Sequence, residues 1–342
     1  MKVMLSSGII GCGRIGCGFD DDISQNKKRT HASGYSICNE TDLIAFSDVD
    51  ASKLKKYGQK FFVENLFKDY NQMFDNLDID VVSICTLSDS HLELVKKAAS
   101  SNVKGIFIEK PIADSLENAK KIIDICKENE IVLLVDHQRR FEPFYHEIKK
   151  IITSEKFGQL QSVYVYYGAG ISNTGSHVFD LLRYFFGEIT TVFSEKSEIL
   201  SPNPLDPNFD VTLKFNQNFY GYLHPLDLSN YGICEFDIFA TGGRLKLDLL
   251  SNQADFFQVN SDSHDYKILS AEKLSADSSS KSGTILGIEN LVSCINSDTI
   301  PLCSGYDGYK SLELIVASIL SASKKTTIPL PLETNSYKIN SK

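Results

Sequence analysis

The stretch Gly8-Ile9-Ile10-Gly11-Cys12-Gly13-Arg14-Ile15-Gly16 decides the fold of this chain. Its first three residues predict a short buried strand, and a G-x-G-x-x-G pattern follows directly. In such a unit the glycines permit a tight turn, a close approach to a pyrophosphate and close helix packing, while N–H groups at the helix start bind phosphate. The alternative is an ordinary glycine turn. The predicted cofactor turn comprises Gly11, Cys12, Gly13, Arg14, Ile15 and Gly16, with Arg14 either on a phosphate or on the surface.

Asp48 ends the next apolar run, residues 43–46. A carboxylate there hydrogen-bonds the ribose hydroxyls of adenosine and repels a 2′-phosphate, so NAD is favoured over NADP. Asp48 lies further from Gly16 than the usual spacing of about 20 residues. We expect residues 18–29 to be an inserted loop, either a lid beside the cofactor or a solvated excursion, with the helix resuming near Thr30.

Three more apolar runs, at 81–85, 105–108 and 131–135, alternate with helical patterns. Continuous apolar strands separated by helices predict a parallel sheet that is covered on both faces. Asp114, with Glu117 three residues later, predicts the cap of one of these helices. The first part of the chain therefore reads as a doubly wound Rossmann domain, residues 1–137.

The pattern changes after about Arg140. Runs of β-branched and aromatic residues without long helices between them predict a large, mostly antiparallel sheet that is open on one face. The predicted strands are 160–167, 189–196, 209–215, 219–224, 233–240 and 244–249, and the predicted helices are 175–186, 284–296 and 307–324. Residues 261–283 are rich in serine and predict a surface excursion. We expect a second α/β domain over residues 138–330, whose final helix, 307–324, can pack back on the Rossmann domain.

Composition narrows the function classes. A chain of 342 residues suits two domains, and a net charge of −9 argues against a nucleic-acid surface. The eight cysteines lack CxxC pairs, the seven histidines are scattered singly, and no apolar run approaches the roughly 18 residues of a membrane span. We expect a cytoplasmic protein with no metal site, no nucleic-acid partner and no membrane segment.

Two further motifs carry chemistry. Glu109-Lys110-Pro111 directly follows the apolar run 105–108, so Lys110 stands at the carboxyl end of a predicted strand, where ligands bind in open α/β sheets. Gly175-Ser176-His177 opens a predicted helix further along the chain. With the glycine turn, these motifs predict a nicotinamide site with an ammonium group beside it.

Together these residues resemble the Gfo/Idh/MocA oxidoreductases, named for glucose–fructose oxidoreductase and inositol dehydrogenase. The resemblance covers nearly the whole chain. It implies an N-terminal Rossmann domain, a C-terminal α/β domain with an open sheet, a bound NAD(P), and a sugar, polyol or nucleotide-sugar substrate. It also implies a homo-oligomer, dimer or tetramer, formed through the C-terminal sheet. The resemblance rests on the glycine turn, Asp48, residues 86–91, residues 109–111, residues 175–180 and residues 328–331.

The resemblance also implies roles for individual residues. Lys110 contacts the substrate and assists proton transfer, and a lysine in a dry cleft beside a cationic nicotinamide has its pKa pushed down towards neutrality. His177 is the catalytic histidine that takes the proton from a substrate hydroxyl. Asp180, on the same helix face, orients His177 or binds a substrate hydroxyl. The remaining expected cofactor contacts are Thr86, along the nicotinamide ribose, Glu109 and His91, and for His91 a plain helix-start role is equally open.

Asn173 departs from the resemblance, because the family commonly has aspartate four residues before the histidine. Asparagine keeps a hydrogen-bonding carbonyl but cannot stabilise a protonated His177 or act as a base. Three consequences of Asn173 are open: a weaker proton relay, a hydrogen bond from Asn173 to a sugar hydroxyl, or loss of activity. We favour the hydrogen bond to a sugar hydroxyl. Arg139 and Arg140 are either a diphosphate-binding pair or hinge residues. Tyr167 either lines the sugar pocket or packs in the sheet.

The leading hypothesis is an NAD-dependent oxidoreductase that moves a hydride to or from a carbinol or keto carbon of a sugar. Within that class we favour a nucleotide-linked sugar of surface-polysaccharide synthesis over a free polyol of the inositol type. A non-net-redox enzyme that recycles bound NAD is a second hypothesis. A dinucleotide-binding sensor without catalysis is a third, because a fold alone does not fix function.

Overall fold

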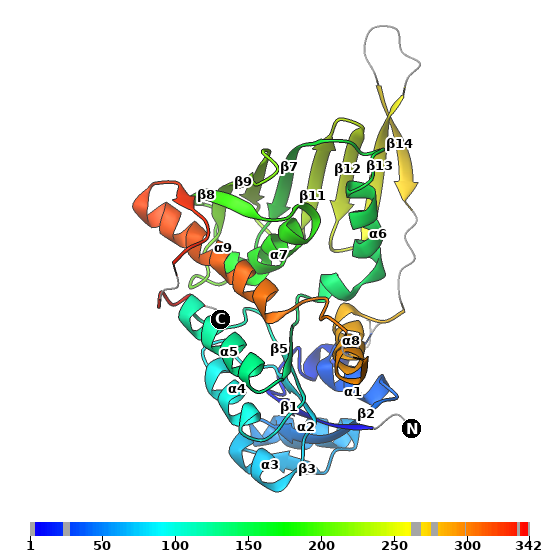
Figure 1. Cartoon of the computed structure of the whole chain (residues 1–342), viewed down its shortest axis with the longest axis vertical. Coiled ribbons are helices and arrows are strands. Elements are labelled where there is room, and N and C mark those ends of the chain that lie inside the picture. The colour runs from blue at the N-terminus through cyan, green and yellow to red at the C-terminus, as the bar shows by residue number, and fades with distance from the viewer. Residues whose placement is uncertain are drawn as a thin grey trace. The chain divides into compact units, whose positions relative to one another are not determined.

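The computed structural model describes residues 4–22, 28–260, 268–274, 280–297, 299–333 and 336–340. The chain forms two compact units (Figure 1). Unit 1 comprises Met1–Glu142, Ser279–Lys310 and Thr334–Lys338, and unit 2 comprises Pro143–Ser278, Ser311–Glu333 and Ile339–Lys342. The sequence predicted one second domain over residues 138–330. In the structure, Ser279–Lys310 belongs to unit 1 instead.

Unit 1 contains, among its described residues, a six-stranded sheet in the order β3-β2-β1-β4-β5-β6. Every neighbouring pair is parallel, which confirms the predicted Rossmann sheet. The strand order reverses between β1 and β4, and such a switch point is where open α/β sheets bind ligands. The strands are β1 (Leu5–Ile10), β2 (Thr41–Ser47), β3 (Asn65–Phe67), β4 (Val81–Ile84), β5 (Gly105–Ile108) and β6 (Val132–Val135).

Two groups of helices lie to either side of this sheet (Figure 1): α1 contacts α2 and α8, and α4 contacts α3 and α5. The helix α8, from the later segment, packs so closely on β5 that a side chain at Gly287 would meet the Phe107 ring at 2.6 Å. This contact explains why the later segment belongs to unit 1. The helices are α1 (His31–Ile37), α2 (Ala51–Phe61), α3 (Tyr70–Asn76), α4 (His91–Ala99), α5 (Leu116–Glu128) and α8 (Gly283–Ser297), with short turns η1 (Gly18–Asp21) and η2 (Gln138–Phe141).

The predicted cap of α5 was wrong by one residue. Ser115 is the N-cap, and its hydroxyl accepts the backbone N–H of Asn118 at 3.2 Å. Asp114 instead accepts the side-chain N–H of Asn118 at 2.7 Å and pairs with Lys338 at 2.8 Å. The carboxylate is thus used to tie a distant segment to the helix start.

Unit 2 contains a nine-stranded sheet in its described part, in the order β14-β13-β12-β11-β7-β10-β9-β8-β15. Only β7 and β10 among these neighbours run parallel, so the mostly antiparallel prediction is confirmed. The strands are β7 (Leu160–Tyr167), β8 (Ile189–Lys196), β9 (Phe209–Phe215), β10 (Tyr220–Pro225), β11 (Glu235–Ala240), β12 (Gly243–Asp248), β13 (Gln253–Asn260), β14 (Ile268–Leu274) and β15 (Ile328–Pro329).

Strand β14 lies within residues 261–283, which the sequence presented as a surface excursion. The prediction of irregular structure is therefore wrong for 268–274, while residues 261–267 and 275–279 lie outside the described residues. Strand β14 pairs with β13 over its whole length, so backbone bonding overrides the polar composition.

Three helices accompany this sheet: α6 (Pro143–Ile152), α7 (Gly175–Phe186) and α9 (Gly305–Lys324). They lie along the near face of the sheet in Figure 1. Side chains of the central strands alternate between buried and partly exposed. The first turn of α9 belongs to unit 1. There, a side chain at Gly308 would meet Val135 of β6 at 2.7 Å. The start of this helix thus packs on the Rossmann sheet. No helix in the described part of the chain is both long and apolar enough to span a membrane.

Candidate functional site

The glycine turn lies at the carboxyl end of β1 and is tied to β2 by the N–H of Gly11, which donates to Ser47 O at 2.8 Å. Gly11 has a φ of 97°, and a side chain there would meet the Cys85 backbone at 2.8 Å, so only glycine fits. At Gly13, by contrast, an added Cβ would meet no described atom within 4 Å. The turn therefore leaves its middle glycine open to a phosphate, as a dinucleotide site requires.

The inserted loop interrupts the first Rossmann helix. A single turn follows the glycines, with Cys17 N–H donating to Gly13 O at 3.0 Å. The regular helix is α1, where His31 N–H donates to Ile15 O at 3.1 Å and Ala32 N–H donates to Gly16 O at 2.9 Å. The helix thus resumes where the sequence predicted. Residues 23–27, part of the predicted insertion over 18–29, lie outside the described residues, so the lid stays a prediction.

Two of the three carboxylates at the start of the insertion, those of Asp20 and Asp21, bind groups in or next to helices. Asp20 accepts the hydroxyls of Thr30 at 2.5 Å and Ser33 at 2.6 Å on the α1 side. Asp21 pairs with Lys56 at 2.7 Å and Lys60 at 2.8 Å on α2. The described beginning of the insertion is therefore held against unit 1.

Asp48 is fixed at the rim of the glycine turn. One carboxylate oxygen accepts the N–H of Cys12 at 2.7 Å, and the other accepts the N–H of Asp50 at 2.9 Å. The side chain of Arg14 is exposed and lies over the ring of Phe19, 4.6 Å from its centroid. The turn thus carries a placed carboxylate, suited to ribose hydroxyls, and a nearby cation.

His91 serves a different role from the predicted cofactor contact. Its ring is fully buried, with Nδ1 3.0 Å from Ile112 O and Nε2 3.2 Å from Thr86 O. Burial lowers the pKa of His91, whose ring lies between the loops that follow β4 and β5. A fully enclosed ring has no surface for a ligand, which corrects the prediction. Thr86 is half-buried and hydrogen-bonds Ser90 at 2.7 Å.

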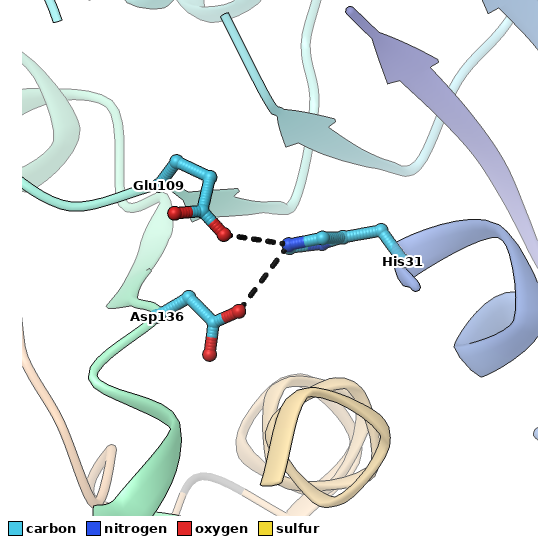
Figure 2. A group of neighbouring side chains, drawn as sticks. All are labelled: His31, Glu109 and Asp136. Atoms are coloured by element: carbon cyan, nitrogen blue, oxygen red, sulfur yellow. Dashed lines mark hydrogen bonds and ion pairs between the residues drawn. The ribbon is translucent and has the colours of Figure 1, made fainter. Parts of the chain in front are cut away.

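Lys110 follows β5 and precedes a cis peptide bond to Pro111. Its backbone N–H donates to Glu109 Oε2 at 3.2 Å, and its side chain is partly exposed. The Glu109 side chain turns inward, so that Oε1 lies 3.3 Å from Nε2 of the buried His31 (Figure 2). The Glu109 carboxylate therefore bonds protein groups next to Lys110, and its cofactor contact stays a prediction. Sequence reasoning missed His31, whose partners lie far along the chain.

Unit 2 contributes Asn173, His177 and Asp180. Asn173 lies in a short helical turn, η3 (Gly170–Thr174), and His177 lies in the first turn of α7. Both are partly exposed, whereas Asp180 is buried. Asp206, from the loop between β8 and β9, fixes this turn by accepting the N–H groups of Ser172 at 2.8 Å and Asn173 at 2.9 Å. Asp206 was not found from the sequence, where only the Asp-Pro-Asn turn signal marks it.

Two predicted substrate contacts are used elsewhere. Tyr167 is fully buried, and its hydroxyl donates to Phe209 O at 2.7 Å and accepts Phe209 N–H at 2.9 Å. Its place in a sugar pocket is therefore corrected to sheet packing. Arg140 is buried and pairs with Asp307 at 3.0 Å, so it does not form a ligand-binding pair with Arg139, which is partly exposed in η2.

Each unit therefore carries some of the predicted site residues. In unit 1, the glycine turn, Asp48, Thr86 and Lys110 share the carboxyl edge of one parallel sheet. In unit 2, Asn173 and His177 stand at the start of α7. A hollow of about 650 Å³ in unit 2 is lined by residues outside this set, among them Gln159, Phe185 and Gln217. The site residues offer dinucleotide binding and proton transfer.

Comparison with known proteins agrees with this geometry. Residues 5–137 match the family model GFO_IDH_MocA, an oxidoreductase family with an NAD-binding Rossmann fold. Residues 168–330 match the C-terminal alpha/beta domain of the same oxidoreductase family. The two matches cover most of the chain.

Individual relatives have low sequence identity to this chain, but their matches cover most of it. The uncharacterized oxidoreductase YrbE of Bacillus subtilis is 27% identical and covers 72% of this chain and 75% of its own. The myo-inositol 2-dehydrogenase of Thermotoga maritima is 26% identical, covering 70% and 74%. The WlbA dehydrogenase of Bordetella pertussis, crystallised with NADH and UDP-GlcNAcA, is 20% identical, with a TM-score of 0.77 over 96% of this chain and 99% of its own.

Proposed function

The chain belongs to the Gfo/Idh/MocA family of NAD-dependent oxidoreductases, and from this premise we propose that it moves a hydride to or from a carbinol or keto carbon of a sugar. The observation that carries the proposal is the order of the strand ends in unit 1. The glycine turn ends β1, Thr86 follows β4 and Lys110 follows β5, and these three strands are direct neighbours. A cofactor bound along this edge leaves an ammonium group beside its reactive end.

Alcohol oxidation needs a base as well as a hydride acceptor. The C–H bond of the carbinol breaks with its electron pair, which bound NAD accepts, and the hydroxyl proton passes to a protein group. We assign this proton to Lys110 and His177. In ketone reduction the same groups return the proton to the oxygen. Burial against a substrate and a cationic nicotinamide lowers the pKa of a lysine, which suits Lys110 for the role near neutrality.

Asn173 and Asp180 are assigned to substrate orientation. The amide of Asn173 is neutral, so it donates and accepts hydrogen bonds without taking a proton. That chemistry fits a sugar hydroxyl, and the backbone of Asn173 is already fixed by Asp206 at 2.9 Å. Asp180 is buried one turn after His177 and is suited to orient that ring.

The favoured substrate is a nucleotide-linked sugar, as in surface-polysaccharide synthesis. Support comes from the shared fold of the WlbA dehydrogenase, whose crystals contain UDP-GlcNAcA, and from the partly exposed Arg139 after β6. The second candidate is a polyol dehydrogenase. Support for it comes from the myo-inositol 2-dehydrogenase relative and from Arg140, whose pairing with Asp307 removes one of the expected diphosphate contacts.

A homo-oligomer formed through the sheet of unit 2 is part of the proposal. Tyr164 and Tyr222 stack with centroids 5.0 Å apart, and both remain more than a third exposed. Aromatic side chains of this kind are typical of the centre of protein interfaces. Light scattering on Tyr222→Lys is expected to give a smaller particle than the natural chain. Tyr231→Lys, which changes an exposed loop residue instead, is the matched control; equal masses for all three proteins would contradict the proposed interface.

The function is tested by following absorbance at 340 nm with NAD or NADH and a panel of nucleotide sugars, inositols and their keto forms. Lys110→Ala is run alongside, with NAD binding measured by calorimetry. Turnover that is lost in the variant while NAD still binds supports the proposal. Turnover of inositol alone selects the polyol reading. NAD binding without turnover in either direction would contradict net redox chemistry and favour internal recycling or a sensor.

A further inference from the structure

His31 is enclosed at the centre of unit 1, at the start of α1. Its side chain is fully buried, and the ring packs 4.8 Å from that of Phe107. Nε2 faces two carboxylates, 3.3 Å from Glu109 Oε1 and 3.4 Å from Asp136 Oδ2 (Figure 2). These partners end β5 and β6, so one ring joins the ends of two neighbouring strands.

The hydrogen bonds around the ring assign its protons. The hydroxyl of Ser83 donates its one hydrogen to the Tyr35 oxygen at 2.9 Å. The oxygen of Ser83 must then accept from His31 Nδ1, which lies 2.8 Å away. If Nε2 carried no hydrogen, its lone pair would face both carboxylates. A hydrogen on Nε2 makes the ring an imidazolium that donates towards both oxygens.

The surrounding charges agree with a cationic ring. Burial alone would lower the pKa of His31, but Cys85 and the carboxylates of Asp136 and Glu109 raise it well above its usual value. Burial would raise the pKa of Glu109, yet the bond and charge of His31 and the charge of Lys110 lower it.

Asp136 behaves differently. Burial and the charge of Glu109 raise its pKa to about 6, against the opposing effect of His31. From α8, Thr284 donates its hydroxyl to Asp136 at 3.0 Å. The polar groups that face the ring thus come from β4, from the end of β5 and from the end of β6, and the cationic charge is assigned to His31.

We propose that His31 is a positioning residue for Lys110, held as a buried imidazolium that fixes Glu109 and, through it, the backbone of Lys110. Glu109 binds in two directions, with Oε1 towards His31 and Oε2 accepting the N–H of Lys110 at 3.2 Å. The cation also offsets the carboxylates that lie beneath the Lys110 ammonium group. The proposal rests on the assignment of Lys110 as a proton-transfer group.

Removal of the cation has a definite effect on that lysine. With fewer positive charges nearby, the protonated form of Lys110 is favoured and its pKa rises. In alcohol oxidation the neutral amine is required, so the acidic limb of the kcat/KM profile in His31→Gln moves to higher pH, by about half a unit to one unit. The backbone of Lys110 also loses its support, and kcat falls about tenfold while the Kd for NAD changes little.

The experiment combines two readouts. Nitrogen-15 NMR of histidine-labelled protein, with the His31 signals identified by their loss in His31→Gln, reports protonation without any need for turnover. Both ring nitrogens are expected to keep imidazolium shifts between pH 6 and 8. Neutral-ring shifts at pH 7 would overturn the assignment, as would a stoichiometric divalent metal that is present in the natural protein and absent from His31→Gln.

The pH profile of kcat/KM then separates positioning from mere stability. His91→Gln, a change at an equally buried ring that bonds backbone carbonyls, is expected to lower the melting temperature without moving the acidic limb. The double variant His31→Gln/Asp136→Asn restores the net charge of the cluster and is expected to return the limb towards its natural position. If the acidic limb of the kcat/KM profile lies at the same pH in His31→Gln as in the natural protein, the proposal is wrong. If no substrate is turned over, the proposed function fails while the NMR result still stands.

Discussion

Asp206 holds Asn173 in place: its Oδ2 accepts the backbone N–H of Asn173 at 2.9 Å, and its Oδ1 accepts that of Ser172 at 2.8 Å. Only 3% of Asp206 is exposed, so both bonds are shielded from water. The turn before α7 is therefore held in part by a loop between two strands, in addition to its own bond from the Ser176 hydroxyl to Asn173 O. The backbone of Asn173 is thus fixed at the start of α7, next to the proposed proton-transfer residue His177.

Asp206→Asn is expected to loosen this turn. An amide group places an N–H where a carboxylate oxygen accepted one, so one backbone donor loses its buried partner at a cost of roughly 1–3 kcal/mol of unfolding free energy. We expect kcat to fall about tenfold, because Asn173 and His177 lose their fixed geometry. Urea unfolding and steady-state kinetics measure the two effects. Asp210→Asn, in a partly exposed pair with His224, is the control and should leave both near their natural values.

Asp48→Asn is expected to weaken the choice of NAD over NADP. The negative charge that repels a 2′-phosphate is lost, while one oxygen remains to accept the N–H of Cys12. We expect the ratio of kcat/KM for NAD to that for NADP to fall by about tenfold. Asp50→Asn removes the same charge two residues later and should change the ratio little. Equal ratios in the natural protein and Asp48→Asn would contradict the assigned role.

Tyr167→Phe tests whether the hydroxyl is structural. Its removal leaves the buried N–H and C=O of Phe209 without their partner, at a cost of about 1–2 kcal/mol of unfolding free energy. The KM for substrate should stay unchanged, because the hydroxyl is enclosed in the sheet. Tyr166→Phe, at the partly exposed neighbouring position, is the control for stability. A raised KM with unchanged stability would restore Tyr167 to the substrate site.

The stability difference between the natural protein and Asp20→Asn is expected to depend on pH in a definite direction. Burial would raise the pKa of Asp20, but hydrogen bonds from Ser33, Thr30 and Arg29 outweigh it and lower the pKa below the ordinary 3.8. A depressed carboxyl pKa stabilises the fold above the unfolded-state value, and that contribution is lost as the pH falls through the folded-state value.

The natural protein should therefore exceed Asp20→Asn by roughly 1 kcal/mol at pH 7, with a smaller difference below pH 4. Thermal unfolding across this range measures the difference. Asp78→Asn, at an exposed position, should show no such trend. A difference that grows on acidification would contradict the assigned bonds.

Much of the fold could be predicted because the patterns were strong. The strands at 160–167, 189–196 and 209–215 and the helix at 175–186 have the predicted bounds, since alternation or helical spacing marks them along their whole length. Strand β3 was missed because its three residues are at most half-buried and carry no apolar run. Helix α6 was missed because its pattern begins at Pro143, where the strand–helix alternation of unit 1 has just ended.

The site was predictable only where its residues sit in local motifs. The glycine turn, Asp48 and Lys110 are read directly from neighbours in sequence. His31 and Glu109 are 78 positions apart, and only the sheet brings them together. For Tyr167 the packing alternative given by the sequence agrees with the structure: Tyr167 shares the parity of Val163 and Val165 in one strand, and all three are buried.

The division of unit 1 between distant segments has a consequence for the order of synthesis. Strands β5 and β6 are complete early, but α8, whose Gly287 lies against Phe107, is translated only after the strands of unit 2. Until α8 is made, the surface of β5 and β6 that it covers in the folded unit lacks that cover. A chain that stopped anywhere within residues 143–278 would therefore lack α8, a helix of the cofactor-binding unit, although residues 1–142 would be intact.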